Sequence, residues 1–178
     1  MRMLASLVAV AVAATPLTLW ASLPQGAVAP DFTTSGALAG KPFKLHLKAQ
    51  LRHGPVVLYF FPKSFTQGCT MEAHAFSESA AQFHKLGARV IGMSGDDYPT
   101  LARFSVEACR NAFPVATATA ETIHAYDVPL KEGSPLTNRT SFVIAPDGKI
   151  VYAYSDLDWR NHVTNTLAAV RDWKAKRH

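Results

Sequence analysis

The stretch from Pro55 to Pro62 is an unbroken apolar run between two prolines. A run that is this short and this rich in valine and aromatic residues is typical of a strand buried on both faces. From Thr70 onward, apolar residues recur at helical spacing until Gly87, which is a favourable helix end. A buried strand that leads directly into a helix predicts an α/β fold.

The segments that follow repeat this alternation. Residues 88–94 form a second apolar run, and Asp97 and Pro99 provide helix-start chemistry for a pattern that continues to Ala112. Shorter patterns predict strands at 43–47 and 115–118, a helical turn at 121–125, a hairpin at 141–155 around Pro146, and a last helix at 163–173. This order predicts one thioredoxin-like domain over residues 23–178, in which a mixed central sheet carries helices on both faces. The first two strands of the strand–helix alternation, at 55–62 and 88–94, are expected to be parallel.

The first 22 residues carry the pattern of an export signal. Arg2 is followed by an apolar tract, and no further charge occurs before Asp31. The tract from Leu4 to Trp20 is also close to the minimum of about 17 residues that can cross a membrane. We therefore expect export to a bacterial periplasm through a signal peptide over residues 1–22, with an uncleaved anchor facing the periplasm as the alternative.

The net charge of +5 arises largely from basic residues near the C-terminus. Cations suit the end of a helix because of its dipole, and no basic stripe interleaved with aromatic residues is present, so we do not expect a nucleic-acid partner. The seven histidines are scattered without ligand spacing. We therefore expect neither a metal nor another cofactor.

One of the two cysteines, Cys69, falls where the central strand gives way to the helix. Unpaired backbone N–H groups and the helix dipole favour a negative charge in the first helical turn, so a thiol there tends to ionise. Two simpler interpretations stay open. Two cysteines in an exported protein often form a structural disulfide, and a lone buried cysteine is often inert packing.

The residues around Cys69 resemble a known active-site motif. The string PKSFTQGC, from Pro62 to Cys69, fits P-x-x-x-[T/S]-x-x-C, the motif of the peroxiredoxins in the AhpC/TSA superfamily. The longer stretch FFPKSFTQGCTMEAHAF is most similar to their Q-type, or bacterioferritin-comigratory, branch. APDF at 29–32 resembles the first strand of that family and NRTSFVIAPDGKI resembles its arginine-bearing hairpin, so the likeness extends from about Ala29 to the C-terminus.

The resemblance implies a role for each of four residues. Cys69 would be the peroxidatic nucleophile, which attacks a peroxide and becomes a sulfenic acid. Thr66 would orient the peroxide, Arg139 would hold the thiolate and the leaving oxygen, and Pro62 would close the pocket. Taken singly, Thr66 also fits a helix cap, Arg139 a surface arginine and Pro62 a strand terminator.

The resemblance also implies a second thiol that resolves the sulfenic acid. Many Q-type proteins carry it five residues after the first, where this chain has His74. Cys109, which we expect in the second helix, is the remaining candidate for a disulfide with Cys69. Such a bond needs Cα atoms within roughly 7 Å, so helix ends would have to unwind during turnover. The alternative is that Cys109 only packs in the core and that the resolving thiol comes from another molecule.

We therefore expect an antioxidant, thiol-dependent peroxidase that reduces hydrogen peroxide and organic hydroperoxides. A thioredoxin-like or other dithiol donor would reduce it, and it would exist as a monomer or weak dimer. The first rival is a thiol–disulfide oxidoreductase on the same scaffold, although this would need a second cysteine where Glu72 stands. The second rival is a copper-delivery protein.

Two further residues keep two interpretations each. Glu72 fits either a polar support or a solvated helix position, and Trp159 fits either the border of the substrate entrance or a helix-capping segment.

Overall fold

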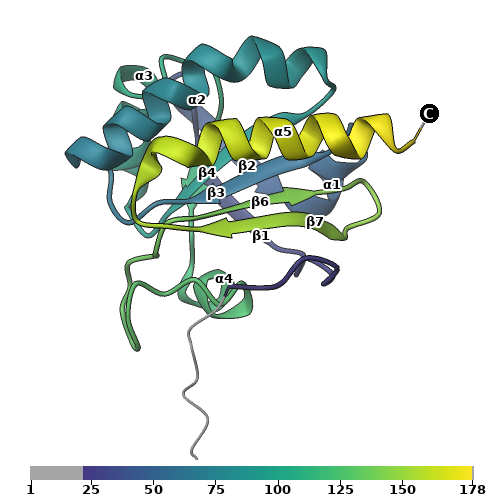
Figure 1. The fold of residues 1–178 in the computed structure, drawn as a ribbon. Coiled ribbons are helices and arrows are strands. Elements are labelled where there is room, and N and C mark those ends of the chain that lie inside the picture. Colours follow the sequence, from purple (N-terminus) through teal and green to yellow (C-terminus); the bar gives the residue numbers. More distant parts are fainter. Residues whose placement is uncertain (1–21, 178) are drawn as a thin grey trace, which may run out of the picture.

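The computed structural model describes residues 22–177 (Figure 1). The expected signal or anchor over residues 1–22 lies outside this range except for Ser22, so its boundary with the folded domain stays a prediction. Within the described range, no helix combines the length and the apolar character that a membrane span requires.

The chain order of the elements follows the predicted alternation of strands and helices. The elements are β1 (Thr33–Leu38), β2 (Lys41–His46), α1 (Leu47–Leu51), β3 (Val56–Phe60), α2 (Gln67–Lys85), β4 (Arg89–Ser94), α3 (Tyr98–Glu107), β5 (Val115–Thr117), α4 (Ala120–Ala125), β6 (Thr140–Ile144), β7 (Ile150–Ser155), the short 3₁₀ helix η1 (Trp159–Asn161) and α5 (His162–Ala175).

Seven strands form one mixed sheet in the order β2-β1-β5-β4-β3-β6-β7. β3 pairs parallel with β4, and β4 pairs parallel with β5, as expected for strands joined by helices. On its other side, β3 pairs antiparallel with β6, which forms the predicted hairpin with β7. The N-terminal hairpin of β1 and β2 extends the opposite edge, beside β5.

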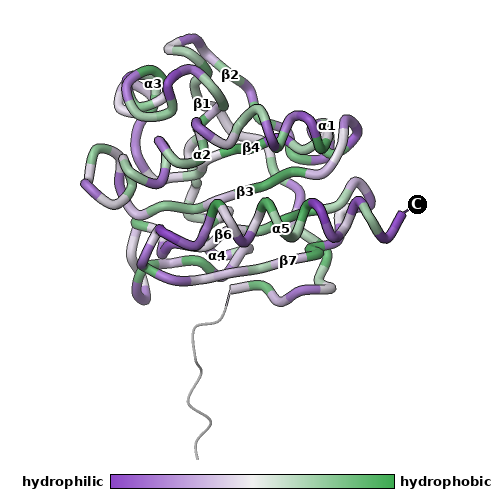
Figure 2. The backbone as a smooth tube through the Cα atoms, turned by 45° about the horizontal axis from the view of Figure 1, so that its top comes forward, coloured by the Kyte–Doolittle hydropathy of each residue, from purple (hydrophilic) through white to green (hydrophobic). Residues whose placement is uncertain are grey.

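Helices cover both faces of this sheet. α2, α3 and α5 pack on one face, whereas α4 lies on the opposite face together with the N-terminal segment (Figure 1). Side chains of β3 alternate between the two layers, with Val57 and Tyr59 in the cluster under α2, and Val56 and Leu58 in the cluster with α1 and α4. Every residue of β3 is buried, and Figure 2 shows this strand in hydrophobic colours inside the molecule. The prediction of a central strand buried on both faces is confirmed.

The second helix is shorter than its apolar pattern indicates. The prediction that it continues to Ala112 and contains Cys109 is wrong, because α3 ends at Glu107 and Cys109 lies in the turn that follows. Arg110 and Asn111 have φ angles of 50° and 62°, in the left-handed region where helices commonly end. The N–H groups of Cys109 and Asn111 bond back to carbonyl groups of the helix and close this turn.

The first strand begins later than the family resemblance implies. Residues 29–32 form no strand, and β1 starts at Thr33. Pro30 has no N–H to donate to a strand ladder, and the carbonyl of Phe32 accepts from the N–H of Leu47 at 3.2 Å instead. The five residues of α1 were not predicted either, since so short a helix shows no recognisable period.

Candidate active site

Cys69 lies in the first turn of α2, directly beyond the carboxyl end of β3. Its side chain is buried, with 1% of its surface exposed. The first backbone hydrogen bond of this turn is donated by Thr70 to Thr66, at 2.9 Å. The N–H groups of Gly68 and Cys69 precede it and have no acceptor among the described residues. The helix therefore presents free N–H donors beside the sulfur, where they favour an anion.

The loop between β3 and α2 is held from several sides. The N–H of Ser64 donates to Oδ2 of Asp96 at 2.7 Å, and the hydroxyl of Ser94 donates to the same oxygen at 2.8 Å. Phe65 has a left-handed φ of 64°, and its ring packs edge-on against Phe104 with centroids 5.3 Å apart. A bulky residue adopts such a backbone only where its surroundings enforce it, so the loop has a fixed shape.

Arg139 reaches Cys69 from the strand side of the site. It directly precedes β6, and because β6 runs antiparallel to β3, its side chain arrives near the end of β3. Nη2 donates to Sγ of Cys69 at 3.4 Å, Nη1 donates to Oε2 of Glu72, and Nε donates to the carbonyl of Leu157 at 2.9 Å. The arginine is 5% exposed. The alternative of an ordinary surface arginine is therefore wrong.

Arg139 keeps its positive charge in this site. Burial lowers the pKa of the guanidinium, but the neighbouring Glu72 and Cys69 raise it by more, and its pKa is raised overall. One permanent cation thus faces two acidic groups, a thiol and a carboxyl. This arrangement can stabilise a thiolate and a developing oxyanion.

Glu72 is the second acidic group of the site and is completely buried. Burial raises the pKa of its carboxyl to about 8, although the charge and the hydrogen bond of Arg139 act in the opposite direction. Its Oε1 has no hydrogen-bond partner among the described residues and lies 3.8 Å from Nδ1 of His162. The alternative of a solvated helix position is wrong.

His162, at the start of α5, completes a buried polar cluster that the sequence patterns do not reveal. Its Nε2 lies 2.9 Å from the carbonyl oxygen of Asp156, and its Nδ1 lies 2.8 Å from Oγ of Ser141. Burial lowers the pKa of this imidazole to about 4. In the sequence, His162 is one of seven scattered histidines, and only the packing of α5 on β6 brings it to the site.

The other two residues implied by the motif, Thr66 and Pro62, make no hydrogen bond to the sulfur in this structure. Thr66 is the N-cap residue of α2 by position, but its side chain makes no cap bond and its hydroxyl donates to the carbonyl of Lys63 at 3.0 Å. Pro62 is half-buried and lies two residues after the end of β3. Trp159 lies beside Gly68, with its Cδ1 3.7 Å from where a Cβ on that glycine would be. The roles of Thr66 and Pro62 stay predictions.

Cys109 is a free thiol in the same apolar cluster as Cys69. It is fully buried, and burial raises the pKa of its thiol far above the ordinary value. A thiol in this state is a poor nucleophile. The two cysteines form no disulfide in this structure.

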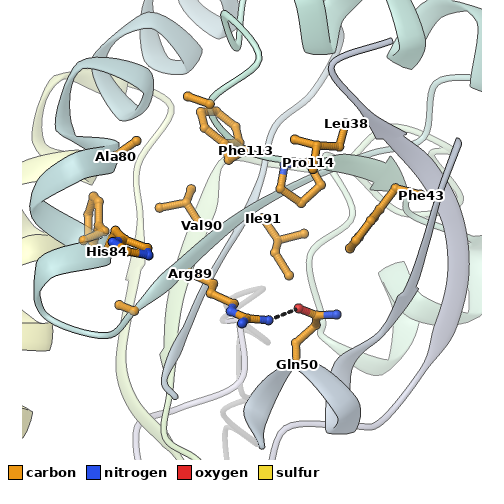
Figure 3. A pocket seen from close by; sticks show the side chains of 13 residues that line it. Leu38, Phe43, Gln50, Ala80, His84, Arg89, Val90, Ile91, Phe113 and Pro114 are labelled. Carbon is orange, nitrogen blue, oxygen red and sulfur yellow. Dashed lines mark hydrogen bonds between the residues drawn. The ribbon is translucent and has the colours of Figure 1, made fainter. Parts of the chain in front are cut away.

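An apolar cavity of about 240 Å³ lies away from these residues (Figure 3). Its walls come from the second half of α2, the start of β4 and residues 112–114. Figure 3 shows His84 on one wall, Phe43 on another, and the hydrogen bond between Arg89 and Gln50 at the border. His84 lies about four helical turns, or roughly 22 Å, along α2 from Cys69. The cavity is therefore separate from the thiol site.

A group of three or more histidine, cysteine, aspartate or glutamate side chains that could hold a metal ion does not occur within residues 22–177. The chemistry that the described site offers is that of a thiol beside a buried arginine and free helix N–H groups. Such a site can carry a sulfur nucleophile and stabilise negative charge on a departing oxygen.

Comparisons with known proteins agree with this chemistry. The model of the AhpC/TSA family matches residues 25–153. Chloroplastic peroxiredoxin Q of Triticum aestivum is 31% identical over 150 residues, which is 83% of this chain and 67% of the relative. Among solved structures, peroxidoxin BcpB of Mycobacterium tuberculosis has a TM-score of 0.73 at 31% identity, covering 83% of this chain and 96% of that one.

A second solved structure bears on the kind of reaction. The bacterioferritin comigratory protein of Xanthomonas campestris, described for its alkyl peroxide reduction activity, has a TM-score of 0.69 at 28% identity. The match covers 79% of this chain and 91% of that one.

Proposed function

The chain belongs to the AhpC/TSA family and is a thiol-dependent peroxidase related to the peroxiredoxin Q and Bcp proteins, and we propose that Cys69 is its peroxidatic nucleophile. The observation that carries this assignment is the hydrogen bond from Arg139 to the sulfur of Cys69 inside a buried site. It joins two residues that are remote in the chain, and it agrees with the roles that the motif implies for both.

These contacts support the following course of the reaction. The thiolate of Cys69 attacks one peroxide oxygen, the O–O bond breaks, and the sulfur becomes a sulfenic acid while the other oxygen leaves as hydroxide or alkoxide and takes up a proton. The guanidinium of Arg139 and the free N–H groups at the start of α2 stabilise the charge that moves onto the departing oxygen. The hydroxyl of Thr66 orients the peroxide, and Pro62 shields the site from water.

The proposed substrates are hydrogen peroxide and organic hydroperoxides. The described activity of the Xanthomonas campestris relative on alkyl peroxides supports the second class. The surface beside the site also supports it, because Leu157, whose carbonyl binds Arg139, leaves 63% of its surface exposed. An apolar side chain in that position can contact the alkyl part of a hydroperoxide.

Replacement of Cys69 tests the assignment. Cys69→Ser should abolish the consumption of both hydrogen peroxide and an alkyl hydroperoxide, whereas Cys109→Ser should leave the first, stoichiometric reduction intact. The measurement is loss of peroxide in a single turnover of the reduced protein. An unchanged rate in Cys69→Ser would refute the assignment.

We further propose that Cys109 resolves the sulfenic acid by forming a disulfide with Cys69 and releasing water. Its place in a short turn supports this, since a turn opens more readily than a helix interior. Mass spectrometry after one equivalent of peroxide should show a Cys69–Cys109 crosslink. A lasting sulfenic acid at Cys69 would refute internal resolution.

The remaining proposals concern the setting of the enzyme. A thioredoxin-like or other dithiol protein returns the thiols to their reduced form, the chain acts as a monomer or weak dimer, and residues 1–22 direct it out of the bacterial cytoplasm. Catalytic turnover with thioredoxin, sedimentation of the folded domain, and fractionation of cells that express the full chain test these proposals separately. Glu72, where an oxidoreductase would carry its second cysteine, is buried and paired with Arg139, so we do not favour that rival.

A further inference from the structure

The peroxidase site holds one cation for two acidic groups. Arg139 donates to both Cys69 and Glu72, and all three side chains are buried. Two anions facing a single buried cation are unfavourable, so a proton on one of the two acids stabilises the site. Whichever acid keeps the proton leaves the charge of Arg139 to the other.

His162 faces the oxygen of Glu72 that Arg139 does not bind. The carbonyl of Asp156 can only accept, so Nε2 of His162 carries a hydrogen and donates to it. The neutral ring then has a lone pair on Nδ1, to which the hydroxyl of Ser141 donates. The same Nδ1 lies 3.8 Å from the unpartnered Oε1 of Glu72.

The unprotonated Nδ1 carries a partial negative charge 3.8 Å from this carboxyl oxygen, and this charge distinguishes the two forms of the acid. It repels an ionised carboxylate more strongly than a neutral carboxylic acid. We propose that His162 is a positioning residue of the peroxidase site: its unprotonated Nδ1 favours the proton on Glu72, which leaves the charge of Arg139 to the thiolate of Cys69. This inference rests on the proposed role of Cys69 and adds a residue that the active-site motif does not contain.

The charged and titratable groups around the ring are consistent with a neutral imidazole. Burial has the largest effect on His162, and Arg139 also disfavours a second cation there. The carbonyl of Asp156 and the carboxylates of Asp156 and Asp158 act in the opposite direction but do not outweigh burial. Tyr154, whose ring lies edge-on to His162 at 4.8 Å, is also near the cluster, as are the side chains of Glu72, Cys69, Cys109 and Tyr59.

The test follows the pH at which Cys69 becomes reactive. The rate at which a small alkylating reagent modifies Cys69 is measured against pH, with mass spectrometry to assign the site, and its midpoint reports the thiolate. His162→Leu removes the partial negative charge beside Oε1, so Glu72 ionises more readily and competes with Cys69 for Arg139. We expect the midpoint to rise by about one unit, which is about a tenfold loss of thiolate at lower pH.

Glu72→Gln separates this role from a purely structural one. Glutamine stays neutral and can accept from Arg139 as a neutral Glu72 does, so the midpoint of this variant should match that of the natural chain. In the Glu72→Gln background, His162→Leu should no longer move the midpoint. His84→Leu, at an exposed position on the same helix as Cys69, is the matched control and should leave both midpoint and peroxidase activity unchanged.

Three outcomes would overturn the proposal. The midpoint could stay unchanged in His162→Leu, the shift could have the same size in the Glu72→Gln background, or Glu72→Gln alone could lower the midpoint, which would mean that Glu72 is ionised in the natural chain. If His162→Leu does not fold, Glu72→Gln alone can still overturn the proposal by lowering the midpoint. A natural chain that consumes no peroxide would contradict the proposed function instead. The two failures can be told apart, because the alkylation rate of Cys69 is measured without peroxide.

Discussion

Nη2 of Arg139 lies 3.4 Å from Sγ of Cys69, although 70 positions of sequence separate the two residues. The contact depends on the antiparallel pairing of β3 and β6, which brings the residue before β6 to the end of β3. Because the same guanidinium also binds Glu72 and the carbonyl of Leu157, its orientation is fixed before any peroxide arrives. A donor that is already in place needs no reorganisation during the reaction.

Replacement of Arg139 by lysine should slow the first oxidation strongly. Arg139→Lys keeps a positive charge but loses the planar fork that serves Cys69, Glu72 and Leu157 together, and we expect the rate of peroxide reduction to fall about 100-fold. Stopped-flow measurement of a single turnover checks this. Arg171→Lys, on the exposed face of α5, is the control and should keep the natural rate. An equal rate for both variants would mean that charge alone is sufficient.

A substitution of Thr66 can distinguish its two possible roles, which are to orient the peroxide and to cap α2. Its hydroxyl makes no cap bond in this structure, so Thr66→Val should change the free energy of unfolding by less than about 0.5 kcal/mol while peroxide reduction falls about 100-fold. Thr66→Ser, which keeps the hydroxyl, should retain most of the activity. If Thr66→Val instead loses about 1 kcal/mol of stability at full activity, the residue is a helix cap. Urea unfolding and a peroxide assay on the same samples give both quantities.

The buried His162 predicts a loss of stability in acid. Its pKa is lowered from 6.5 to about 4, so below pH 6.5 the unfolded chain binds a proton that the folded chain does not. The stabilising contribution is therefore complete above pH 6.5 and is lost as the pH falls toward 4, by roughly 3 kcal/mol in all.

His162→Gln tests this dependence, because glutamine does not titrate. The difference in unfolding free energy between the natural chain and the variant should become smaller, or change sign, as the pH falls from 6.5 to 4. Urea unfolding at a series of pH values measures it. His124→Gln, at an exposed position on α4, should show no such trend, and a constant difference for His162→Gln would contradict the prediction.

Gly36 should not tolerate a side chain. A Cβ at this position would overlap the carbonyl oxygen of Val115 and the Cα of Ala116, where β1 pairs with β5. Backbone atoms inside a sheet cannot move aside as a flexible side chain can, so Gly36→Ala should destabilise the fold by about 3 kcal/mol. Ser35→Ala, at the exposed neighbouring position, should change stability by less than about 0.5 kcal/mol. Thermal unfolding of the two variants gives the comparison.

The parts of the fold that could be predicted are those whose pattern has one simple cause. β3 is buried throughout and β4 is buried after Arg89, so their sequences are largely apolar, and α2 and α5 each bury one stripe at helical spacing. The end of α3 could not be predicted in this way. Ala108 and Cys109 continue the apolar pattern because the turn itself is buried, and burial in a turn looks like one more helical repeat.

The residues of the candidate site also differ in whether local sequence reveals them. Cys69 was found because its place at a helix start and its motif are local in sequence. Glu72 could have been recognised as buried, since a residue three positions after Cys69 lies on the same face of the helix. The contact of Arg139 was implied only by resemblance, and His162 could not be found at all, because both depend on how distant segments pack against β3.

Cys69 and Cys109 lie in one apolar cluster, and this affects how fast the enzyme can be recycled after each oxidation. If their sulfurs join during each cycle, part of the interior must come apart and reassemble every time a peroxide is consumed. Changes that stiffen this interior would then leave the first oxidation fast but delay recycling, so the most heat-resistant variants of this chain would be its slowest catalysts.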